Sequence, residues 1–279
     1  MITSDSATPN NSLCEVTLAV HGSLAAVFGV LTGAAAGLIG VGGGEFRIPV
    51  LLYLFGSEVK TAAGVNLVVG LFTVCLAFIR RWGQHAWARE DIVLASVFTV
   101  ASLFGAVLGA RQAHRWSSAL LRKIVCLYLL MVGAWMMIEA ISQTDHVVLN
   151  PQGAGKIFLA AIIGFLIAAV SAVLGVAGGE MRIPALMYLF AMPIKAAGTI
   201  SLLVSIPSVA AGALTYRRLG HVPNRVLLIA IVMASGSLAG VFIGTSLLPL
   251  VNTHVLKGIL GIILLLATAA LALHRNPAK

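Results

Sequence analysis

Long apolar stretches alternate with short polar or glycine-rich segments along almost the whole chain. Eight of these stretches are long enough for a helix to cross a bilayer, which needs about 20 residues at ~1.5 Å per residue. They cover residues 16–39, 59–79, 91–110, 119–141, 156–174, 195–215, 226–248 and 254–273. This pattern predicts a membrane protein built from several spanning helices.

Two shorter apolar segments follow glycine-rich sequences, at about 46–56 and about 181–191. Each has about 11 residues, which as a helix spans about 16 Å, or half a bilayer. We therefore predict an all-α polytopic membrane protein with two homologous four-span repeats. Each repeat is expected to contain a glycine-broken helix and a short half-helix or re-entrant segment.

The two halves repeat one another at an offset of 135 residues. Residues 40–60 (GVGGGEFRIPVLLYLFGSEVK) and 175–195 (GVAGGEMRIPALMYLFAMPIK) are identical at 13 of 21 positions. Internal repeats of this kind are typical of secondary transporters. The expected organisation is a disordered N-terminal tail (1–15), a first repeat (16–141), a linker (142–155), a second repeat (156–273) and a C-terminal tail (274–279).

The relative orientation of the repeats depends on what the short segments do. Four crossings per half would make the repeats parallel, whereas an additional crossing by each short segment would invert them. The loop cations do not fix the orientation, because nine Lys and Arg fall on the cytoplasmic side for either placement of the N-terminus. We favour four spans plus a re-entrant segment.

Composition and charge agree with a membrane protein. Apolar residues make up 59% of the chain, charged residues 10%, and mean hydropathy is +1.03. The chain has 18 Lys and Arg against 9 Asp and Glu, which gives a net charge of +9. We expect the excess cations to hold the membrane topology and to contact anionic lipid headgroups, and some of them to attract an anionic substrate. The sequence contains no soluble basic domain of the kind that binds nucleic acid. The three cysteines and seven histidines show no metal-ligand or disulfide spacing.

The duplicated motif combines a glycine run with a proline. Consecutive glycines weaken a helix, so the backbone is expected to unwind at Gly40 and Gly175. Pro49 and Pro184 suit the first turn of the helix that follows. A helix N-terminus aimed at unwound backbone offers free N–H groups to an anion. Unwound backbone at membrane depth also implies that a cavity lies beside it.

Each motif also carries a Glu and, two residues later, an Arg. Charges inside a membrane need a partner or a function. Glu45 and Glu180 are therefore candidates for proton coupling, and Arg47 and Arg182 for contact with an oxyanion. The alternatives are that these Glu and Arg residues pair to hold the break in shape, or that the Arg side chains reach the lipid headgroups.

Polar residues on the following spans extend the candidate site. Asn66 aligns with Ser201, and Thr199 is close by; these side chains either bond neighbouring helices or line the substrate route. Lys60 and Lys195 are either membrane anchors or part of a cationic vestibule. The pairs Gly105/Gly109 and Gly240/Gly244 have the small-xxx-small spacing of close helix packing.

The motifs resemble those of the sulfite exporter (TauE/SafE) family over nearly the whole chain. Gly40-Val41-Gly42-Gly43-Gly44 through Pro49 and Leu51 resemble the first family motif, and Gly175 through Pro184 and Leu186 the second, with Ala177 within the glycine run. Ala197-Gly198-Thr199 with Leu202 resembles the signature of the second half. The resemblance implies export of sulfite, sulfonates or related anions across the bacterial inner membrane.

The resulting hypothesis is a secondary transporter of a small sulfur-containing anion that works by alternating access, with proton coupling as a weaker expectation. An anion channel is the alternative, and no catalytic, cofactor or nucleotide-binding signature indicates an enzyme. The expected partners are the anionic substrate and membrane lipid, not nucleic acid; a homodimer is left open. The candidate substrate-binding residues are Gly42, Gly43, Gly44, Glu45, Arg47, Asn66, Gly178, Gly179, Glu180, Arg182, Thr199 and Ser201.

Overall fold

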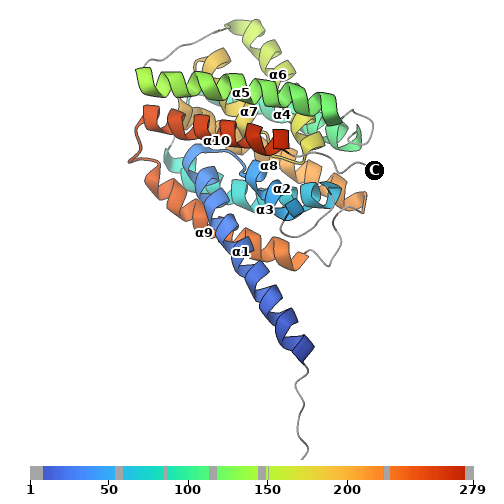
Figure 1. Ribbon diagram of the computed structural model, residues 1–279. Coiled ribbons are helices and arrows are strands. Elements are labelled where there is room, and N and C mark those ends of the chain that lie inside the picture. Colours follow the sequence, from blue (N-terminus) through green and yellow to red (C-terminus); the bar gives the residue numbers. More distant parts are fainter. Residues whose placement is uncertain are drawn as a thin grey trace, which may run out of the picture.

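The computed structural model describes residues 9–53, 59–84, 87–112, 118–143, 149, 151–220, 222 and 227–273. These residues form ten α-helices and one 3-10 turn, and no strand (Figure 1). The elements are α1 (Pro9–Ile39), α2 (Gly44–Tyr53), α3 (Val59–Arg81), η1 (Trp82–Gln84), α4 (Arg89–Gln112), α5 (Ser118–Ser142), α6 (Gly153–Leu174), α7 (Gly179–Phe190), α8 (Ile194–Arg218), α9 (Leu227–Leu247) and α10 (Thr253–Leu273). The expected all-α fold is confirmed.

The long helices match the predicted spans closely. Six of the described helices, α1, α3, α4, α6, α8 and α9, are long and apolar enough to cross a bilayer. Their outer surfaces carry large apolar side chains such as Phe104, Phe158 and Ile231, which are 63%, 70% and 57% exposed. Such surfaces suit contact with lipid.

One boundary differs from the prediction. The first helix begins at Pro9, inside the expected tail of residues 1–15. Proline is favoured in the first turn of a helix, because its missing N–H would have had no partner there. The N-terminal part of α1 projects beyond the helical bundle (Figure 1).

Equivalent helices of the two halves make equivalent contacts, and most of these contacts are with the opposite half. The first helix of each half packs on the fourth helix of the other half, as α1 on α9 and α6 on α4. The third helices α3 and α8 pack together, and so do the fifth helices α5 and α10. Each short helix, α2 or α7, packs on the long helix that follows it. The core is therefore built mainly from contacts between the halves.

Small residues allow two of these pairs to approach closely. The Cα atoms of Gly240 and Gly244 face the backbone carbonyls of Val30 and Ala34 across the α1–α9 contact. In the α4–α6 contact, Gly105 and Gly109 face the carbonyls of Phe165 and Ala169 in the same way. The predicted role of these glycine pairs in packing is confirmed.

Replacing Gly33 with Val is expected to destabilise the α1–α9 pair. A Cβ at Gly33 would meet the backbone of Ser237, which cannot move aside like a flexible side chain. Overpacking of this kind costs about 1–3 kcal/mol. Thermal unfolding in detergent measures the effect, and Gly22→Val on the same helix, where nothing lies within 4 Å, is the control. Equal unfolding midpoints for the two variants would contradict the close approach.

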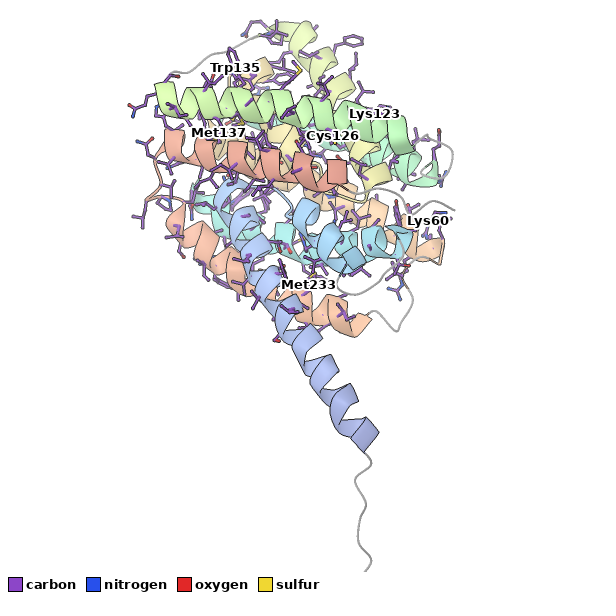
Figure 2. All side chains as sticks on the ribbon, in the orientation of Figure 1. Lys60, Lys123, Cys126, Trp135, Met137 and Met233 are labelled. Atoms are coloured by element: carbon purple, nitrogen blue, oxygen red, sulfur yellow. The ribbon has the colours of Figure 1, made fainter. Side chains whose placement is uncertain are left out.

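Contacts between the halves show which way their helices run. In the α3–α8 pair, Leu67 lies beside Gly212 near the start of α3, whereas Arg81 at its end bonds Thr199 near the start of α8. These two helices are therefore antiparallel. The fifth helices are antiparallel as well, since the Cys126 thiol approaches the Thr268 carbonyl and Glu139 bonds Lys257. Figure 2 places Cys126 and Met137 on the side of α5 beside α10.

Within each half, the first and third helices run in the same direction. The Arg81 guanidinium at the end of α3 bonds the carbonyl of Gly37 at the end of α1, and Tyr216 at the end of α8 bonds the carbonyl of Ala172 in α6. The chain between two such helices must therefore return to its starting side.

The segment that returns contains the glycine-rich backbone and the short helix, which favours five crossings of the bundle per half over four. An odd number of crossings inverts the second half relative to the first. The packing therefore supports the inverted arrangement over the re-entrant one that we had favoured from the sequence.

Candidate functional site

Two extended segments of backbone meet at the centre of the bundle. The first hinge, residues 40–43, joins α1 to α2, and the second hinge, residues 175–178, joins α6 to α7. Both begin and end with a glycine in the left-handed region, at φ +100° and +69° in the first hinge and +74° and +77° in the second. A side chain is strained in that conformation, whereas glycine adopts it readily. The predicted breaks at Gly40 and Gly175 are therefore present.

The hinges touch at equivalent positions. The Cα of Gly42 faces the side chain of Ala177, its counterpart at the 135-residue offset. Gly40 and Gly175 each lie against the third helix of the other half, at Gly198 and Ala63. A residue in contact with its own counterpart lies on the symmetry axis that relates the halves. That axis therefore passes between the two hinges.

A half-helix begins directly at this crossing. The first residue of α7, Gly179, lies so close to the first hinge that an added Cβ would be 2.9 Å from the Cα of Val41 and 3.1 Å from the Gly40 carbonyl oxygen. The first N–H groups of a helix have no partner within the helix, and they form its positive end. Backbone donors are therefore concentrated where the hinges cross.

The prolines lie further into the short helices than the sequence predicted. Pro184 is the sixth residue of α7, and the backbone of Pro49 occupies the same position in α2. Each short helix begins instead at a glycine that follows a left-handed residue. Because proline has no N–H, the carbonyl four residues earlier, that of Glu180, lacks its usual donor within the helix.

Among the described residues, the space beside Ala177 is small. Its volume is about 10 Å³, and it is bordered by Ser171 of α6 and by Ser208 and Gly212 of α8. A void of this size holds at most a single water molecule. Several side chains of α2 lie outside the described residues, so the expected cavity between the hinges stays a prediction.

Arg47 holds the first hinge in shape. It is fully buried, and its Nε donates to the Gly43 carbonyl at 3.2 Å. One terminal nitrogen donates to Thr73 Oγ1 at 3.3 Å, and the other donates to the Gly42 carbonyl. All three nitrogens are therefore bonded within the first half, which favours the structural alternative for this residue.

Arg182 differs from Arg47 in its partners. It is also fully buried, but only Nη1 is bonded, to the Ser201 carbonyl at 3.0 Å and to Ser205 Oγ at 2.8 Å. Its Nε and Nη2 have no hydrogen-bond partner among the described residues, and neither does Ser201 Oγ. Buried charged donors are normally satisfied. Among the described residues, two nitrogens of this guanidinium therefore remain available to a further hydrogen-bond acceptor.

The polar residues of the spans after the short helices lie around the same crossing. Asn66 Nδ2 of α3 donates to the Gly175 carbonyl of the second hinge at 2.7 Å, while its Oδ1 has no partner among the described residues. Thr199 of α8 donates to the Lys195 carbonyl and accepts from Arg81. Asn66, Thr199 and Ser201 are all buried. The structure therefore brings these predicted residues together with the hinges.

The two motif glutamates can be placed only in part. Glu180 is 2% exposed in the first turn of α7, beside Met181, whose carbonyl accepts a 3.1 Å hydrogen bond from Tyr128 of α5. The side chains of Glu45 and Pro49 lie outside the described residues. The predicted role of either glutamate in proton coupling stays a prediction.

Arg81 is a buried residue that the sequence did not single out. It is fully buried, and it bonds the carbonyls of Gly37 in α1 and Lys195 at the start of α8, at 3.4 and 2.7 Å, as well as Thr199. Tyr216 stands at the equivalent position in the second half, with its own bond to Ala172.

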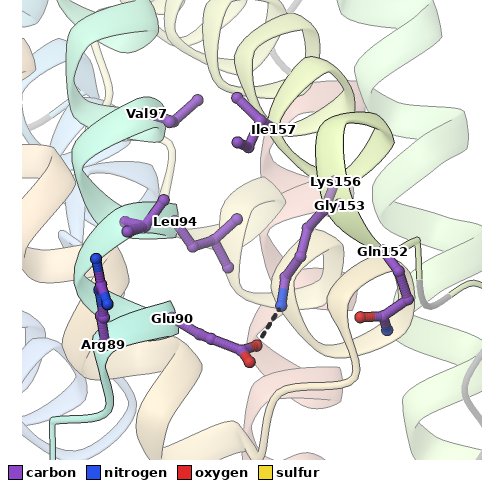
Figure 3. A pocket seen from close by; sticks show the side chains of 9 residues that line it. Arg89, Glu90, Leu94, Val97, Gln152, Gly153, Lys156 and Ile157 are labelled. Atoms are coloured by element: carbon purple, nitrogen blue, oxygen red, sulfur yellow. Dashed lines mark hydrogen bonds and ion pairs between the residues drawn. The ribbon is translucent and has the colours of Figure 1, made fainter.

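Hollows at the bundle surface adjoin the start of the second half. One of about 260 Å³ lies between α4 and α6, where Lys156 bonds Glu90 at 3.1 Å (Figure 3). A neighbouring hollow of about 560 Å³ includes Lys195 at the start of α8. Lys195 therefore borders a surface hollow, as the vestibule alternative predicted, whereas Lys60 is simply exposed.

Comparison with known proteins agrees with this architecture. The chain matches the sulfite exporter TauE/SafE family over residues 24–271. It is 24% identical to "Probable membrane transporter protein YunE" of Bacillus subtilis (strain 168), over 86% of this chain and 93% of that protein. It is also 26% identical to "Probable membrane transporter protein YdhB" of the same strain, over 81% and 90% of the two chains.

A "Probable membrane transporter protein" of Xylella fastidiosa (strain 9a5c) is 28% identical, over 59% of this chain and 62% of that protein. No solved structure matches the chain. The family match covers most of the sequence, including both hinges and all the long helices except the start of α1 and the end of α10. The protein is therefore an integral membrane transporter that belongs to the sulfite exporter TauE/SafE family.

Proposed function

We propose that the protein is a secondary transporter that exports a small sulfur-containing anion, such as sulfite or an organosulfonate, across the cytoplasmic membrane. The observation that carries this proposal is the crossing of two hinges beside a buried arginine with unused donors. The family name supports the sulfur chemistry of the substrate.

The donors at the crossing suit an oxyanion better than a cation or a neutral solute. The first N–H groups of α7 supply a partial positive charge, and Arg182 supplies a full one. Planar guanidinium groups bond the oxygens of an oxyanion through two parallel N–H donors. Nε and Nη2 of Arg182 have this fork geometry, and both are unpaired among the described residues.

The substrate would contact the hinge amides and Arg182, with Asn66 Oδ1 and Ser201 Oγ accepting from a protonated oxygen or from water. Arg47 would fix the first hinge without touching the substrate, because its three nitrogens are bonded to Gly42, Gly43 and Thr73. Of the two arginines that were candidates for contact with the oxyanion, this proposal retains Arg182.

An inverted arrangement of the halves, together with the small void where the hinges cross, supports a mechanism of alternating access. Each half can open the crossing towards one side of the membrane, because the two halves run in opposite directions across it. The void of about 10 Å³ beside Ala177 is too small for an oxyanion, so binding requires the halves to move relative to each other. A channel would instead need a continuous pore through this region.

Counterflow in proteoliposomes tests the proposal directly. Vesicles that contain the purified protein are loaded with unlabelled sulfite, and uptake of external radiolabelled sulfite is followed. Transient accumulation above equilibrium is expected for a carrier with alternating access and is not expected for a channel. Thiosulfate, sulfoacetate and taurine are tested as competitors, and acetate is the control anion. The absence of exchange for every sulfur compound would overturn the proposed substrate class.

A further inference from the structure

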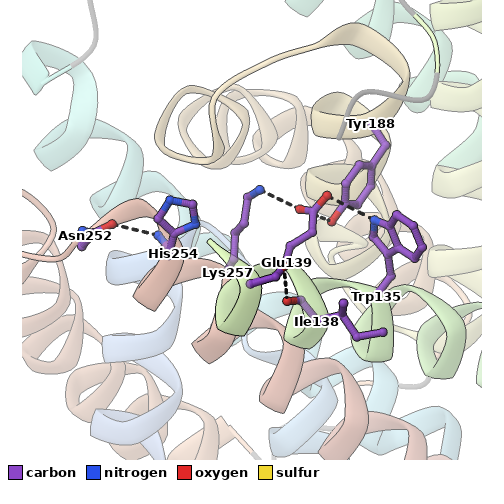
Figure 4. A network of polar contacts seen from close by, with 8 residues as sticks. Trp135, Ile138, Glu139, Tyr188, Asn252, His254 and Lys257 are labelled. Carbon is purple, nitrogen blue, oxygen red and sulfur yellow. Dashed lines mark hydrogen bonds and ion pairs between the residues drawn. The ribbon is translucent and has the colours of Figure 1, made fainter. Parts of the chain in front are cut away.

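A second buried polar cluster lies away from the hinges, where both halves and a half-helix meet. We call it the Glu139 cluster, and it consists of Trp135 and Glu139 of α5, Tyr188 of α7 and Lys257 of α10 (Figure 4). Lys257 Nζ bonds Glu139 Oε2 at 2.6 Å, and the Tyr188 hydroxyl donates to the same oxygen at 3.1 Å. Trp135 Nε1 donates to Glu139 Oε1 at 3.2 Å.

Three of the four cluster residues are almost completely removed from solvent, whereas Trp135 is 44% exposed. Glu139 is 1% exposed, Lys257 4% and Tyr188 8%. Ionised groups at such positions in membrane proteins are costly, and they commonly mark proton or ion pathways. A buried ion pair adds little to stability compared with an apolar pair of the same size. A purely structural role therefore gives a weak reason for a Glu and a Lys at these positions.

The cluster also holds one particular element, the half-helix α7. Its Tyr188 is bonded to Glu139, so the carboxylate of α5 joins α7 to Lys257 of α10. Residues in the left-handed region stand at both ends of α7, Gly178 at φ +77° and Ala191 at φ +54°. A non-glycine residue in this region is strained, and such strain accumulates at switch elements. The helix is thus a rigid unit between two pivots.

We propose that Glu139 is a proton-binding site that controls the position of α7, and hence that it couples proton movement to transport at the hinges. The part of this inference that concerns coupling to transport rests on the proposed function, whereas proton control of α7 does not. A proton on Glu139 converts the carboxylate to a carboxylic acid, and the ion pair with Lys257 is lost. The bond from Tyr188 to the carboxylate weakens at the same time. The half-helix is then free to move with the second hinge.

Polar groups from three helices face Glu139. Lys257 faces it from α10, Tyr188 from α7 and the indole of Trp135 from its own helix. His254 lies one turn before Lys257, beside the exposed Asn252, which accepts a hydrogen bond from its backbone N–H (Figure 4). His254 Nδ1 has no partner among the described residues. The histidine thus lies between the surface and the ion pair.

Labelling of a single cysteine tests proton control of α7 without any substrate. Met192 follows α7 directly and is half-buried, so Met192→Cys is introduced into a variant that lacks the three native cysteines. Each labelling rate is divided by that of a fully exposed cysteine at the same pH, because the reactive thiolate fraction falls as the pH is lowered. We expect this corrected rate to rise about tenfold as the pH is lowered, as when a minor state of about 10% becomes dominant. The variant Glu139→Gln is expected to label rapidly at every pH.

Two further variants keep the test decisive. Glu90→Gln removes a carboxylate that also bonds a lysine but is 80% exposed, and it should keep the wild-type pH response. If Glu139→Gln does not fold, Glu139→Met combined with Lys257→Met replaces the pair by apolar side chains, which buried sites tolerate better than one unpaired charge. This double variant should also label rapidly without dependence on pH.

Flux measurements complete the assignment. In Glu139→Gln, sulfite counterflow should persist, whereas accumulation driven by a pH gradient should be lost. A wild-type labelling rate that does not change with pH, or a normal pH response in Glu139→Gln, would overturn the proton site. If the wild-type protein exchanges no sulfur anion but its labelling still follows pH through Glu139, only the proposed substrate fails.

Discussion

Replacing Arg182 with Gln is expected to lower sulfite exchange about 100-fold while the protein stays folded. The variant removes the donors Nε and Nη2, which have no hydrogen-bond partner in the part of the chain that the structure describes. Two hydrogen bonds from a charged group are worth about 1.5 kcal/mol each, and about 3 kcal/mol corresponds to roughly 100-fold. Counterflow in proteoliposomes measures the loss, and Arg182→Lys should recover only part of it, because lysine lacks the fork of donors.

The matched variant in the first half is Arg47→Gln, and its expected effect is different. Arg47 bonds the carbonyls of Gly42 and Gly43, so its loss leaves buried acceptors without donors. Unsatisfied buried acceptors cost about 1–3 kcal/mol each. We therefore expect a lower unfolding temperature, with exchange reduced only as far as folded protein is lost. Normal exchange in Arg182→Gln would remove this residue from the substrate site.

Replacing Gly42 with Val is expected to block transport by wedging the hinges apart. A Cβ at Gly42 would overlap the methyl group of Ala177. Overpacking costs about 1–3 kcal/mol, which corresponds to roughly 5- to 150-fold in the population of the conformation shown here. Gly42 lies outside the left-handed region, unlike Gly40 and Gly43, so backbone strain does not confuse the result.

Exchange of the two residues at the axis provides the control. Gly42→Ala alone should impair counterflow, whereas Gly42→Ala combined with Ala177→Gly should restore it, because the combined volume at the contact is unchanged. Gly83→Val, at a glycine with nothing within 4 Å, should have no effect. A double variant as impaired as the single one would show that the contact between the hinges does not limit transport.

Much of the fold could be predicted because its signals are local. The length of each apolar stretch specifies a spanning helix, and a glycine run marks a break wherever it occurs. The predicted segments 46–56 and 181–191 differ from α2 and α7 by only a few residues. The positions of the hinges and of the polar residues around them were also available from the repeat.

The difference between the two arginines could not be predicted from their matching motifs. This difference depends on which hydrogen-bond partners the neighbouring long helix offers to each arginine. Ser205 of α8 accepts from Arg182, whereas the equivalent residue of α3 is Gly70, which offers no side chain to Arg47. The arginine of the first half turns instead to the carbonyls of its own hinge. The repeat was visible in the sequence, but the two arginines differ because Ser205 has a side chain that can accept a hydrogen bond and its counterpart Gly70 has none.

Three charged residues near the ends of the predicted spans are buried in the structure. Arg81 and Lys257 are 0% and 4% exposed, because helices of the opposite half cover them. Glu139 lies near the end of an apolar stretch, where its partner Lys257 is 118 positions away. A cation near the end of a span indicates a membrane anchor by default, and only the packing of α5 on α10 shows the ion pair.

By itself, the sequence determined the class of the protein, its helices, its internal repeat and the two glycine hinges, because apolar length and glycine content act on the chain locally. Tertiary structure decided the rest. Its helix contacts favour a crossing by each short helix and an inverted arrangement of the halves. They also show that Gly42 meets Ala177 and that, within the described part of the chain, Arg182 rather than Arg47 keeps donors without a partner. Those features depend on contacts between residues far apart in the chain, which no local pattern specifies.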